Sequence, residues 1–274
     1  GVYGGAVYVK AGAVKLSGGN VSANTASSYG GAVFANPATI EVDGGSFNSN
    51  TANDDGGAFY LSGATMTVTG NTELKKNTAE NRGGAIYLVK KDAQIASLTM
   101  TGGVLEENTG KVGGGAISIR SKCSASFTNT VFDSNTATYG DGEGGGAIYL
   151  GWGSLTLNNV TMTGNTTPAN GGAIRIVGAT ATVSGGTFTG NSAGSGGAIY
   201  VENTASVVNI TDAVFSRNTA TNGGAICVAS GKVNVVGGSF DENDATSSGG
   251  AICVYPSTLE LKDVVFNGNE APYG

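Results

Sequence analysis

The chain has 274 residues, of which 48 are glycine and 12 % are charged; it carries a net charge of −6 and contains no histidine. The acidic balance, without a basic stripe, argues against binding of nucleic acid, and no apolar run of about 18 residues predicts a membrane-spanning helix. Glycine at this frequency also disfavours helices, because each one inside a helix costs about 1 kcal/mol relative to alanine.

One pair of motifs recurs ten times along the whole chain. The first motif is Gly-Gly-Ala followed by strand-forming residues, and the second is an apolar residue three positions before an asparagine. The alanines of the first motif are separated by 25 to 31 residues; they are Ala6, Ala32, Ala58, Ala85, Ala116, Ala147, Ala173, Ala198, Ala225 and Ala251. A period in this range is the signature of a stacked repeat. No linker interrupts it, so we expect residues 1–274 to form a single repeat domain.

Each repeat has the same order of elements. Gly-Gly-Ala is followed by a strand with alternating apolar residues, such as Ile148 and Leu150, and a second strand carries pairs such as Leu155 and Leu157. A third strand holds the apolar residue before the asparagine. Three short strands and three turns suit one coil, or rung, of a β-helix. We therefore predict an all-β fold, a right-handed parallel β-helix (β-solenoid) of about ten rungs of about 26 residues.

The recurring asparagine is predicted to lie in a turn. There its side-chain amide can bond to the same amide one rung above and below, and so satisfy groups that the turn would otherwise bury. We expect such a ladder to comprise Asn24, Asn50, Asn77, Asn108, Asn135, Asn165, Asn191, Asn218, Asn243 and Asn269.

Two further sets of residues are predicted to face outward. The position between the two apolar residues of the first strand is aromatic in six repeats: Tyr8, Phe34, Tyr60, Tyr87, Tyr149 and Tyr200. This aromatic column could stack on sugars or on a partner, or could simply stabilise a parallel sheet. The second strands of the middle repeats present threonine and serine, a pattern that an ice-binding surface would show and that solvated strands also show.

Two repeats are longer, at 31 residues, with insertions near residues 90–94 and 139–143. Insertions in a solenoid mark candidate binding loops, although tolerated variation in loop length explains them equally. The sequence places one candidate ligand patch at the corner of the first insertion, formed by Lys90, Lys91, Arg120, Lys122 and Trp152.

Three cysteines are present. Cys227 and Cys253 hold the same strand position 26 residues apart, so their Cα atoms should lie about 4.8 Å apart, which is compatible with a disulfide. We predict this bridge in the secreted protein, with free thiols as the alternative, and Cys123 alone.

Residues for catalysis are scarce. Without histidine the commonest general base and metal ligand is missing, and outward carboxylates such as Glu41 and Glu260 are eight rungs apart. Acidic clusters at residues 53–55 and 141–143 fall in turns, where a solvated loop and a cation site such as calcium are both conceivable. We predict no enzymatic activity, no catalytic residue, no cofactor and no metal site; the alternative is a β-helix enzyme acting on polysaccharide.

Residues 196–226, GGAIYVENTASVVNITDAVFSRNTATNGGAI, pair Gly-Gly-Ala-Ile with Phe-x-x-Asn. This pairing resembles the repeats of the chlamydial polymorphic membrane proteins and related bacterial surface adhesins. It departs where Val21, Leu74, Leu105 and Met162 replace the phenylalanine. The resemblance implies a secreted, autotransporter-passenger-like segment at the cell surface that acts in adhesion.

From these observations we expect an interior segment of a longer extracellular protein. It would serve as a structural and adhesive spacer, with lateral faces that bind or assemble into a filament. Its partners would be a surface protein or glycan of a host or neighbouring cell, or copies of itself. Neither nucleic acid nor direct insertion into a membrane is expected.

Overall fold

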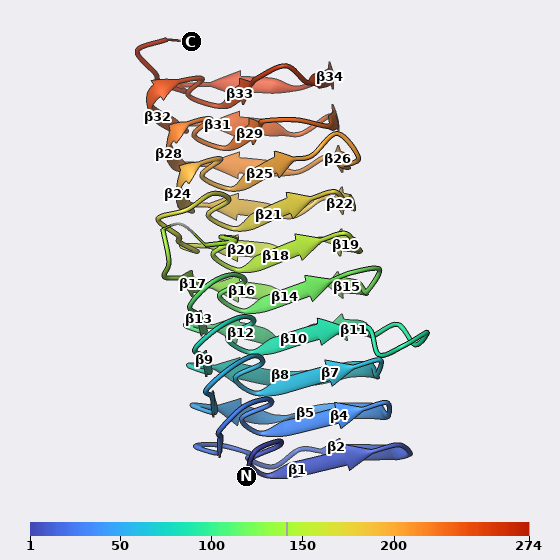
Figure 1. Cartoon of the computed structure of the whole chain (residues 1–274). Helices are drawn as coiled ribbons and strands as arrows, with labels where there is room; N and C mark the ends of the chain where they lie inside the picture. The colour runs from blue at the N-terminus through green and yellow to red at the C-terminus, as the bar shows by residue number, and fades with distance from the viewer. Residues whose placement is uncertain (141, 274) are drawn as a thin grey trace.

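The computed structural model describes residues 1–140 and 142–273. In this part of the chain the fold is a parallel β-solenoid of ten stacked rungs without any helix, and its two ends lie at opposite ends of the stack (Figure 1). Every strand pairing between rungs is parallel, and the first strands keep the register that the repeated motifs predict, for example Ile148 opposite Ile174. The register shifts locally in two pairings, after Asp43 and after Ala220. The predicted fold class is therefore confirmed.

The first sheet contains the strand that follows each Gly-Gly-Ala. Its two inward positions per strand are apolar because they fill the interior of the solenoid. In stacking order the ten strands are β1 (Val7–Lys10), β4 (Val33–Asn36), β7 (Phe59–Ser62), β10 (Ile86–Val89), β14 (Ile117–Arg120), β18 (Ile148–Gly151), β21 (Ile174–Val177), β25 (Ile199–Glu202), β29 (Ile226–Val228) and β33 (Ile252–Val254).

The second and third strands of each rung form a continuous, bent sheet. The second strands are β2 (Ala13–Ser17), β5 (Thr39–Asn48), β8 (Thr65–Lys75), β11 (Ser97–Thr101), β15 (Ser124–Thr128), β19 (Ser154–Asn158), β22 (Thr180–Ser184), β26 (Val207–Thr211), β30 (Lys232–Val236) and β34 (Thr258–Lys262). On the second and third rungs, β5 and β8 extend through the segment that forms a separate third strand on later rungs. Elsewhere the third strands are β12 (Val104–Glu106), β16 (Val131–Asp133), β20 (Thr161–Thr163), β23 (Thr187–Thr189), β27 (Val214–Ser216), β31 (Ser239–Asp241) and β35 (Val265–Asn267).

The structure adds a short strand after the asparagine that the sequence pattern did not predict. In the first half of the chain these strands are β3 (Thr25–Ala26), β6 (Thr51–Ala52), β9 (Thr78–Ala79), β13 (Thr109–Gly110) and β17 (Thr136–Ala137). In the second half they are longer: β24 (Ser192–Ser195), β28 (Thr219–Asn222) and β32 (Asp244–Ser248). The strands of the first half have only two residues each, which are too few to show an alternating pattern, and this is why periodicity missed them.

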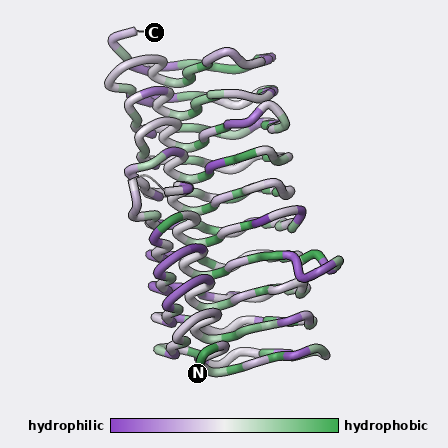
Figure 2. Tube along the Cα trace, viewed as in Figure 1, coloured by the Kyte–Doolittle hydropathy of each residue, from purple (hydrophilic) through white to green (hydrophobic). Residues whose placement is uncertain are grey.

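The core is a single stack of apolar side chains that runs through all the rungs. The phenylalanine before the asparagine stacks on its equivalents, with ring centroids 4.7 Å apart between Phe188 and Phe215 and 4.8 Å apart between Phe215 and Phe240. Figure 2 shows hydrophilic residues gathered at the corners, including the loop that projects between β10 and β11. Burial of this continuous core provides the main stabilisation of the fold.

The paired glycines have two different structural roles. Gly145 has a φ of 71°, a left-handed conformation that other residues rarely adopt. Gly146 has no such angle, but a Cβ atom there would lie 2.0 Å from the carbonyl oxygen of Gly172 on the next rung. The first glycine therefore makes the turn possible, and the second allows neighbouring backbones to approach.

Candidate functional site

The ten asparagines form a continuous ladder along one corner. The Nδ2 atom of Asn135 donates to Asn165 Oδ1 and to the carbonyl oxygen of Leu105, each at 2.9 Å. Asn135 Oδ1 accepts from both the backbone N–H and the Nδ2 of Asn108, each at 3.0 Å. The eight asparagines from Asn50 to Asn243 are fully buried. Their amides are thus saturated by the protein itself, so the ladder is a structural device.

The aromatic column is not the open stripe that the sequence predicted. Tyr8 is 51 % exposed, but Phe34, Tyr87 and Tyr149 are only 6 to 7 % exposed. The rings do stack, with centroids 5.2 Å apart between Phe34 and Tyr60. However, side chains from the turns that precede Gly-Gly-Ala fold over these rings. For example, the ring centroids of Tyr29 and Tyr60 lie 4.6 Å apart. Three of the six rings are therefore unavailable to a ligand, while Tyr60 and Tyr200 are half-buried.

An ionic network covers the middle of this column, and the second insertion supplies its centre. Glu143 Oε2 accepts from Arg82 Nε at 2.9 Å, and its Oε1 lies 2.7 Å from the guanidinium of Arg120. The carboxylate of Asp55 accepts from the backbone N–H of Arg82 at 3.0 Å. Arg120 also lies over the Tyr149 ring, 5.2 Å from its centroid. Asp141, part of the predicted acidic cluster, lies outside the described residues.

Asp55 makes this network sensitive to pH. Burial raises the pKa of its carboxyl group to about 7, with a further contribution from the charge of Asp54. Because the folded protein holds the proton more tightly than the unfolded chain, this contribution to stability is present below about pH 4 and is lost as the pH rises towards 7.

Replacing Asp55 with asparagine keeps the acceptor for Arg82 and removes the titration. We expect the variant to gain stability relative to the parent as pH rises from 4 to 8, by at most about 4 kcal/mol. Urea unfolding of both proteins across this range measures the difference. A stability difference that stays constant with pH would show that Asp55 ionises normally.

The predicted ligand patch is only partly assembled. Trp152 is 54 % exposed, and Lys90, Lys91 and Lys122 are exposed at the same corner. Arg120 is directed elsewhere, because its guanidinium is held by Glu143 over the outer face of the first sheet. The first insertion is held by reciprocal backbone bonds of 2.8 Å between Lys91 and Gln94.

The predicted disulfide is not formed. Cys227 and Cys253 face each other in register on β29 and β33, but both are free thiols, as is Cys123. All three are buried, whereas the sequence pattern placed the pair on an exposed face. Side chains on adjacent in-register strands are separated by about 4.8 Å, which exceeds the Cβ separation of about 3.8 Å that a disulfide prefers.

We expect all three thiols to be protected in the folded protein. Burial, together with the neighbouring Cys253, raises the pKa of Cys227 to about 12, so the reactive thiolate is scarce at neutral pH. Thiol titration without reductant should find three groups after denaturation and slow labelling before it. A single reactive thiol in the denatured protein would contradict this result.

A regular hydroxyl face lies on the second strands. Residues 65–69 of β8 and the whole of β11, β15, β19 and β22 have three outward positions each, and 14 of these 15 positions are serine or threonine, the exception being Asn158. The central column runs through Thr67, Thr99, Ser126, Thr156 and Thr182. Charged and amide residues flank it, including Glu41 on one side and Asn209 on the other.

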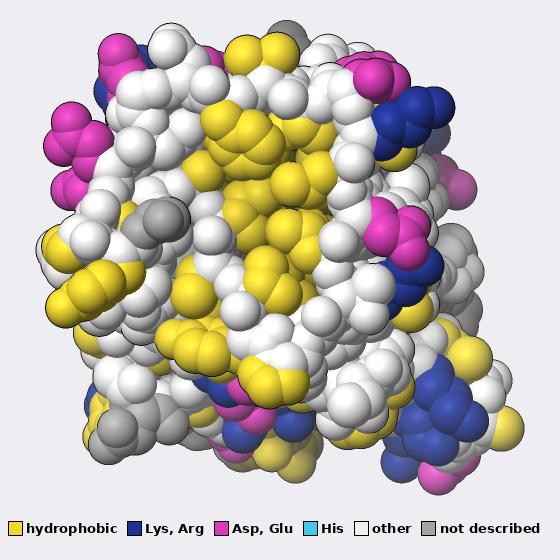
Figure 3. All heavy atoms as spheres, turned by 90° about the horizontal axis from the view of Figure 1, so that it is seen from above, with side chains coloured by type: hydrophobic (Ala, Val, Ile, Leu, Met, Phe, Trp, Pro, Cys, Tyr) yellow, Lys and Arg dark blue, Asp and Glu magenta, His cyan; other side chains and the backbone are white. Residues whose placement is uncertain are grey.

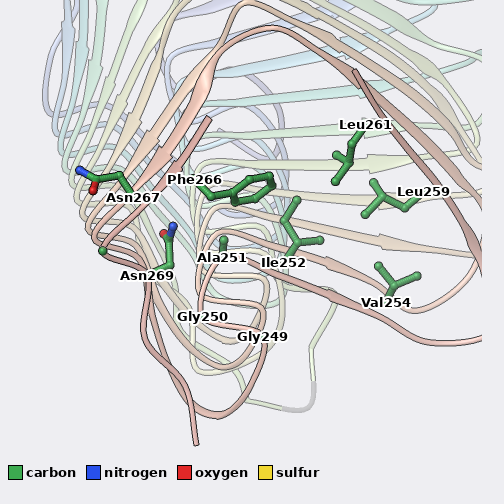
Figure 4. A pocket seen from close by; sticks show the side chains of 11 residues that line it. Gly249, Gly250, Ala251, Ile252, Val254, Leu259, Leu261, Phe266, Asn267 and Asn269 are labelled. Carbon is green, nitrogen blue, oxygen red and sulfur yellow. The ribbon is translucent and has the colours of Figure 1, made fainter. Parts of the chain in front are cut away.

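The remaining features concern possible metal clusters, membrane-spanning helices and the end face of the solenoid. Residues 1–140 and 142–273 contain no cluster of three or more metal-ligating side chains. No helix in that part of the chain is long and apolar enough to cross a membrane. Seen from above, hydrophobic side chains fill the centre of the end face (Figure 3). The hollow there is lined by core residues of the last rung, such as Ile252, Leu259 and Phe266, so it is a continuation of the core (Figure 4).

Comparison with known proteins shows what the second half of the chain is similar to. The family model described as the Chlamydia polymorphic membrane protein repeat matches residues 129–151, 159–176, 183–202, 212–229 and 237–255. Neither a search of curated proteins nor one of solved structures finds a match. The five matched segments each begin near the third strand of one rung and extend into the first strand of the next, so they coincide with the structural repeat. In these five segments, between residues 129 and 255, the chain thus resembles the Chlamydia polymorphic membrane protein repeat.

Proposed function

We propose that this chain is a structural and adhesive segment of an extracellular surface protein, without enzymatic activity. One observation carries the proposal: the interior of the solenoid is occupied by an unbroken core and a saturated asparagine ladder. The differences between rungs lie at the corners and on the outer faces. Such a construction holds lateral surfaces at fixed spacing along a stiff body, which suits display and contact. The family of the matched repeats supports a surface location.

An adhesion assay tests this function directly. Microspheres coated with the folded chain should be retained under flow on cultured cells, whereas microspheres coated with the heat-unfolded chain should not. Treating the cells with protease or with glycosidases separates a protein receptor from a glycan. Analytical ultracentrifugation of the chain alone tests self-association. Equal retention of folded and unfolded protein, together with a monomer at high concentration, would refute the adhesive function.

The hydroxyl face favours one second candidate, an ice-binding surface. Strands about 4.8 Å apart, with outward residues about 6.7 Å apart along each strand, form a flat lattice. Tetrahedral water with O···O distances of about 2.75 Å repeats at about 4.5 Å and 7.3 Å in ice, which is close to this lattice. Thermal hysteresis of the purified chain, compared with the Thr99→Lys/Thr156→Lys variant, decides the matter. No hysteresis in the parent protein removes the candidate.

A further inference from the structure

Trp152 is the only tryptophan of the chain and stands at an unusual backbone position. It occupies the corner between β18 and β19 with a φ of 58°, a conformation that bulky residues rarely adopt. The equivalent position on the next rung is Gly178, with a φ of 59°. This corner has a positive φ on other rungs too, for example at Ala11 and Asn203, but among the described non-glycine residues with positive φ only Trp152 is aromatic.

The Trp152 ring is also fixed in orientation. A Cβ atom placed on Gly178 would lie 2.6 Å from Cε3 and Cζ3 of the indole. The ring thus rests directly on the backbone of the next rung, which only glycine at position 178 permits. With 54 % of the residue still exposed, the ring forms a rigid aromatic platform on the surface. Aromatic rings of this kind provide large contact area at a small cost in conformational entropy.

Three lysines lie along the same corner, on the two rungs that precede Trp152. Lys122 is one rung away, and its backbone N–H donates to the Trp152 carbonyl oxygen at 2.6 Å. Lys90 and Lys91 belong to the projecting loop on the preceding rung, which packs against Gly63. Within residues 1–140 and 142–273, Lys91 contacts Asp92 at 3.8 Å, while neither Lys90 nor Lys122 has an ion pair. Figure 3 shows a cluster of basic side chains at one edge of a molecule whose net charge is −6.

We propose that Trp152, Lys122, Lys90 and Lys91 form a binding site for an anionic oligosaccharide. One pyranose ring stacks on the indole, and sulfate or carboxylate groups of the following sugars meet the lysines. Successive rungs are about 4.8 Å apart, a spacing comparable to one sugar unit, so an oligosaccharide lying along the corner meets a new rung with each residue. The inference rests on the proposed adhesive function and names the ligand class of that function.

Because Trp152 is the only tryptophan, its fluorescence reports directly on this site. Titration with a heparin-derived hexasaccharide should change its emission in a saturable manner, with an affinity that falls as salt increases. The fully desulfated hexasaccharide, which keeps its uronic carboxylates, distinguishes sulfate from carboxylate as the recognised group. A neutral cello-oligosaccharide should leave the emission unchanged. No response to either anionic sugar, or an equal response to the neutral one, overturns the proposal.

Two variants, measured by calorimetry, separate the site from general charge. Trp152→Gly removes the platform and should fold at least as well as the parent, because glycine is favoured at this φ; we expect about a tenfold or greater loss of affinity. Lys90→Ser/Lys91→Ser/Lys122→Ser should lose a similar factor. The charge-matched control Lys15→Ser/Lys232→Ser/Lys262→Ser removes three lysines from the second sheet and should keep the parental affinity.

The cell assay keeps the two proposals distinguishable. If Trp152→Gly binds no hexasaccharide and its microspheres detach, both proposals stand. If its microspheres adhere like those of the parent, adhesion uses another surface and the oligosaccharide site is refuted as its cause. An equal loss of affinity in the control lysine variant would also overturn the site, because binding would then depend only on overall charge.

Discussion

Asn135→Ala should destabilise the solenoid by about 3–5 kcal/mol. The substitution deprives the backbone N–H and the Nδ2 of Asn108 of their acceptor, and it deprives the Leu105 carbonyl oxygen of a donor. All these groups lie in a fully buried turn, where water cannot replace the lost partner. Urea unfolding measures the total loss. Hydrogen exchange at the Asn108 amide measures it locally, and we expect that amide to exchange much faster.

Asn158→Ala is the matched control for this experiment. Asn158 lies on the hydroxyl face, and no hydrogen bond of its side chain is present within residues 1–140 and 142–273. We expect its replacement to change stability by less than about 0.5 kcal/mol. Equal losses in the two variants, or unchanged exchange at Asn108 in Asn135→Ala, would mean that the ladder does not stabilise the turn.

Gly146→Ala should cost about 3 kcal/mol or more, through overpacking between rungs. The new methyl group would lie 2.0 Å from the Gly172 carbonyl oxygen and 2.6 Å from the Thr166 nitrogen. Both obstacles are backbone atoms, and Gly172 belongs to the next rung, so no side chain can move aside. Because Gly146 does not have a positive φ, the loss measures contact between rungs alone. Thermal unfolding followed by circular dichroism provides the comparison.

Gly140→Ala tests whether any glycine-to-alanine change is harmful. The nearest atom to a Cβ at this position is 3.9 Å away, on Pro168. We expect a change within about 0.5 kcal/mol or a slight stabilisation, since alanine restricts the unfolded chain. A well-folded Gly146→Ala protein with the stability of the parent would show that the rungs can separate at this corner without loss.

The two insertions illustrate how a solenoid gains surface features without altering its core. The insertion near residue 143 brings Glu143 over the first sheet, where it joins Arg82 and Arg120. The insertion near residue 91 projects away from the body and leaves the adjacent strands in register. Each change is confined to one corner, because every rung is held by its neighbours. This separation lets the outer surface vary while the stack persists.

The amino-acid sequence by itself determined the solenoid, its period and the position of the ladder. Strands after each Gly-Gly-Ala could be predicted because inward residues such as Ile148 and Leu150 alternate with period two. The place of Asn135 followed from its constant distance to Phe132. These features repeat in every rung, so the sequence shows the same pattern of inward residues and asparagines ten times. The short strand Thr136–Ala137 escaped prediction because two residues carry no alternation.

The tertiary structure alone decided what covers each outer face. Arg82 and Glu143 are 61 residues apart in the chain, yet they bond above the middle of the aromatic column and close that part to ligands. Burial of Cys227 and Cys253 likewise depends on what packs over their sheet, which a strand pattern does not encode. The Trp152 platform exists because Gly178 lies beneath the ring on the next rung. Contacts of this kind join single residues of different rungs, so no repeated pattern within the sequence could reveal them.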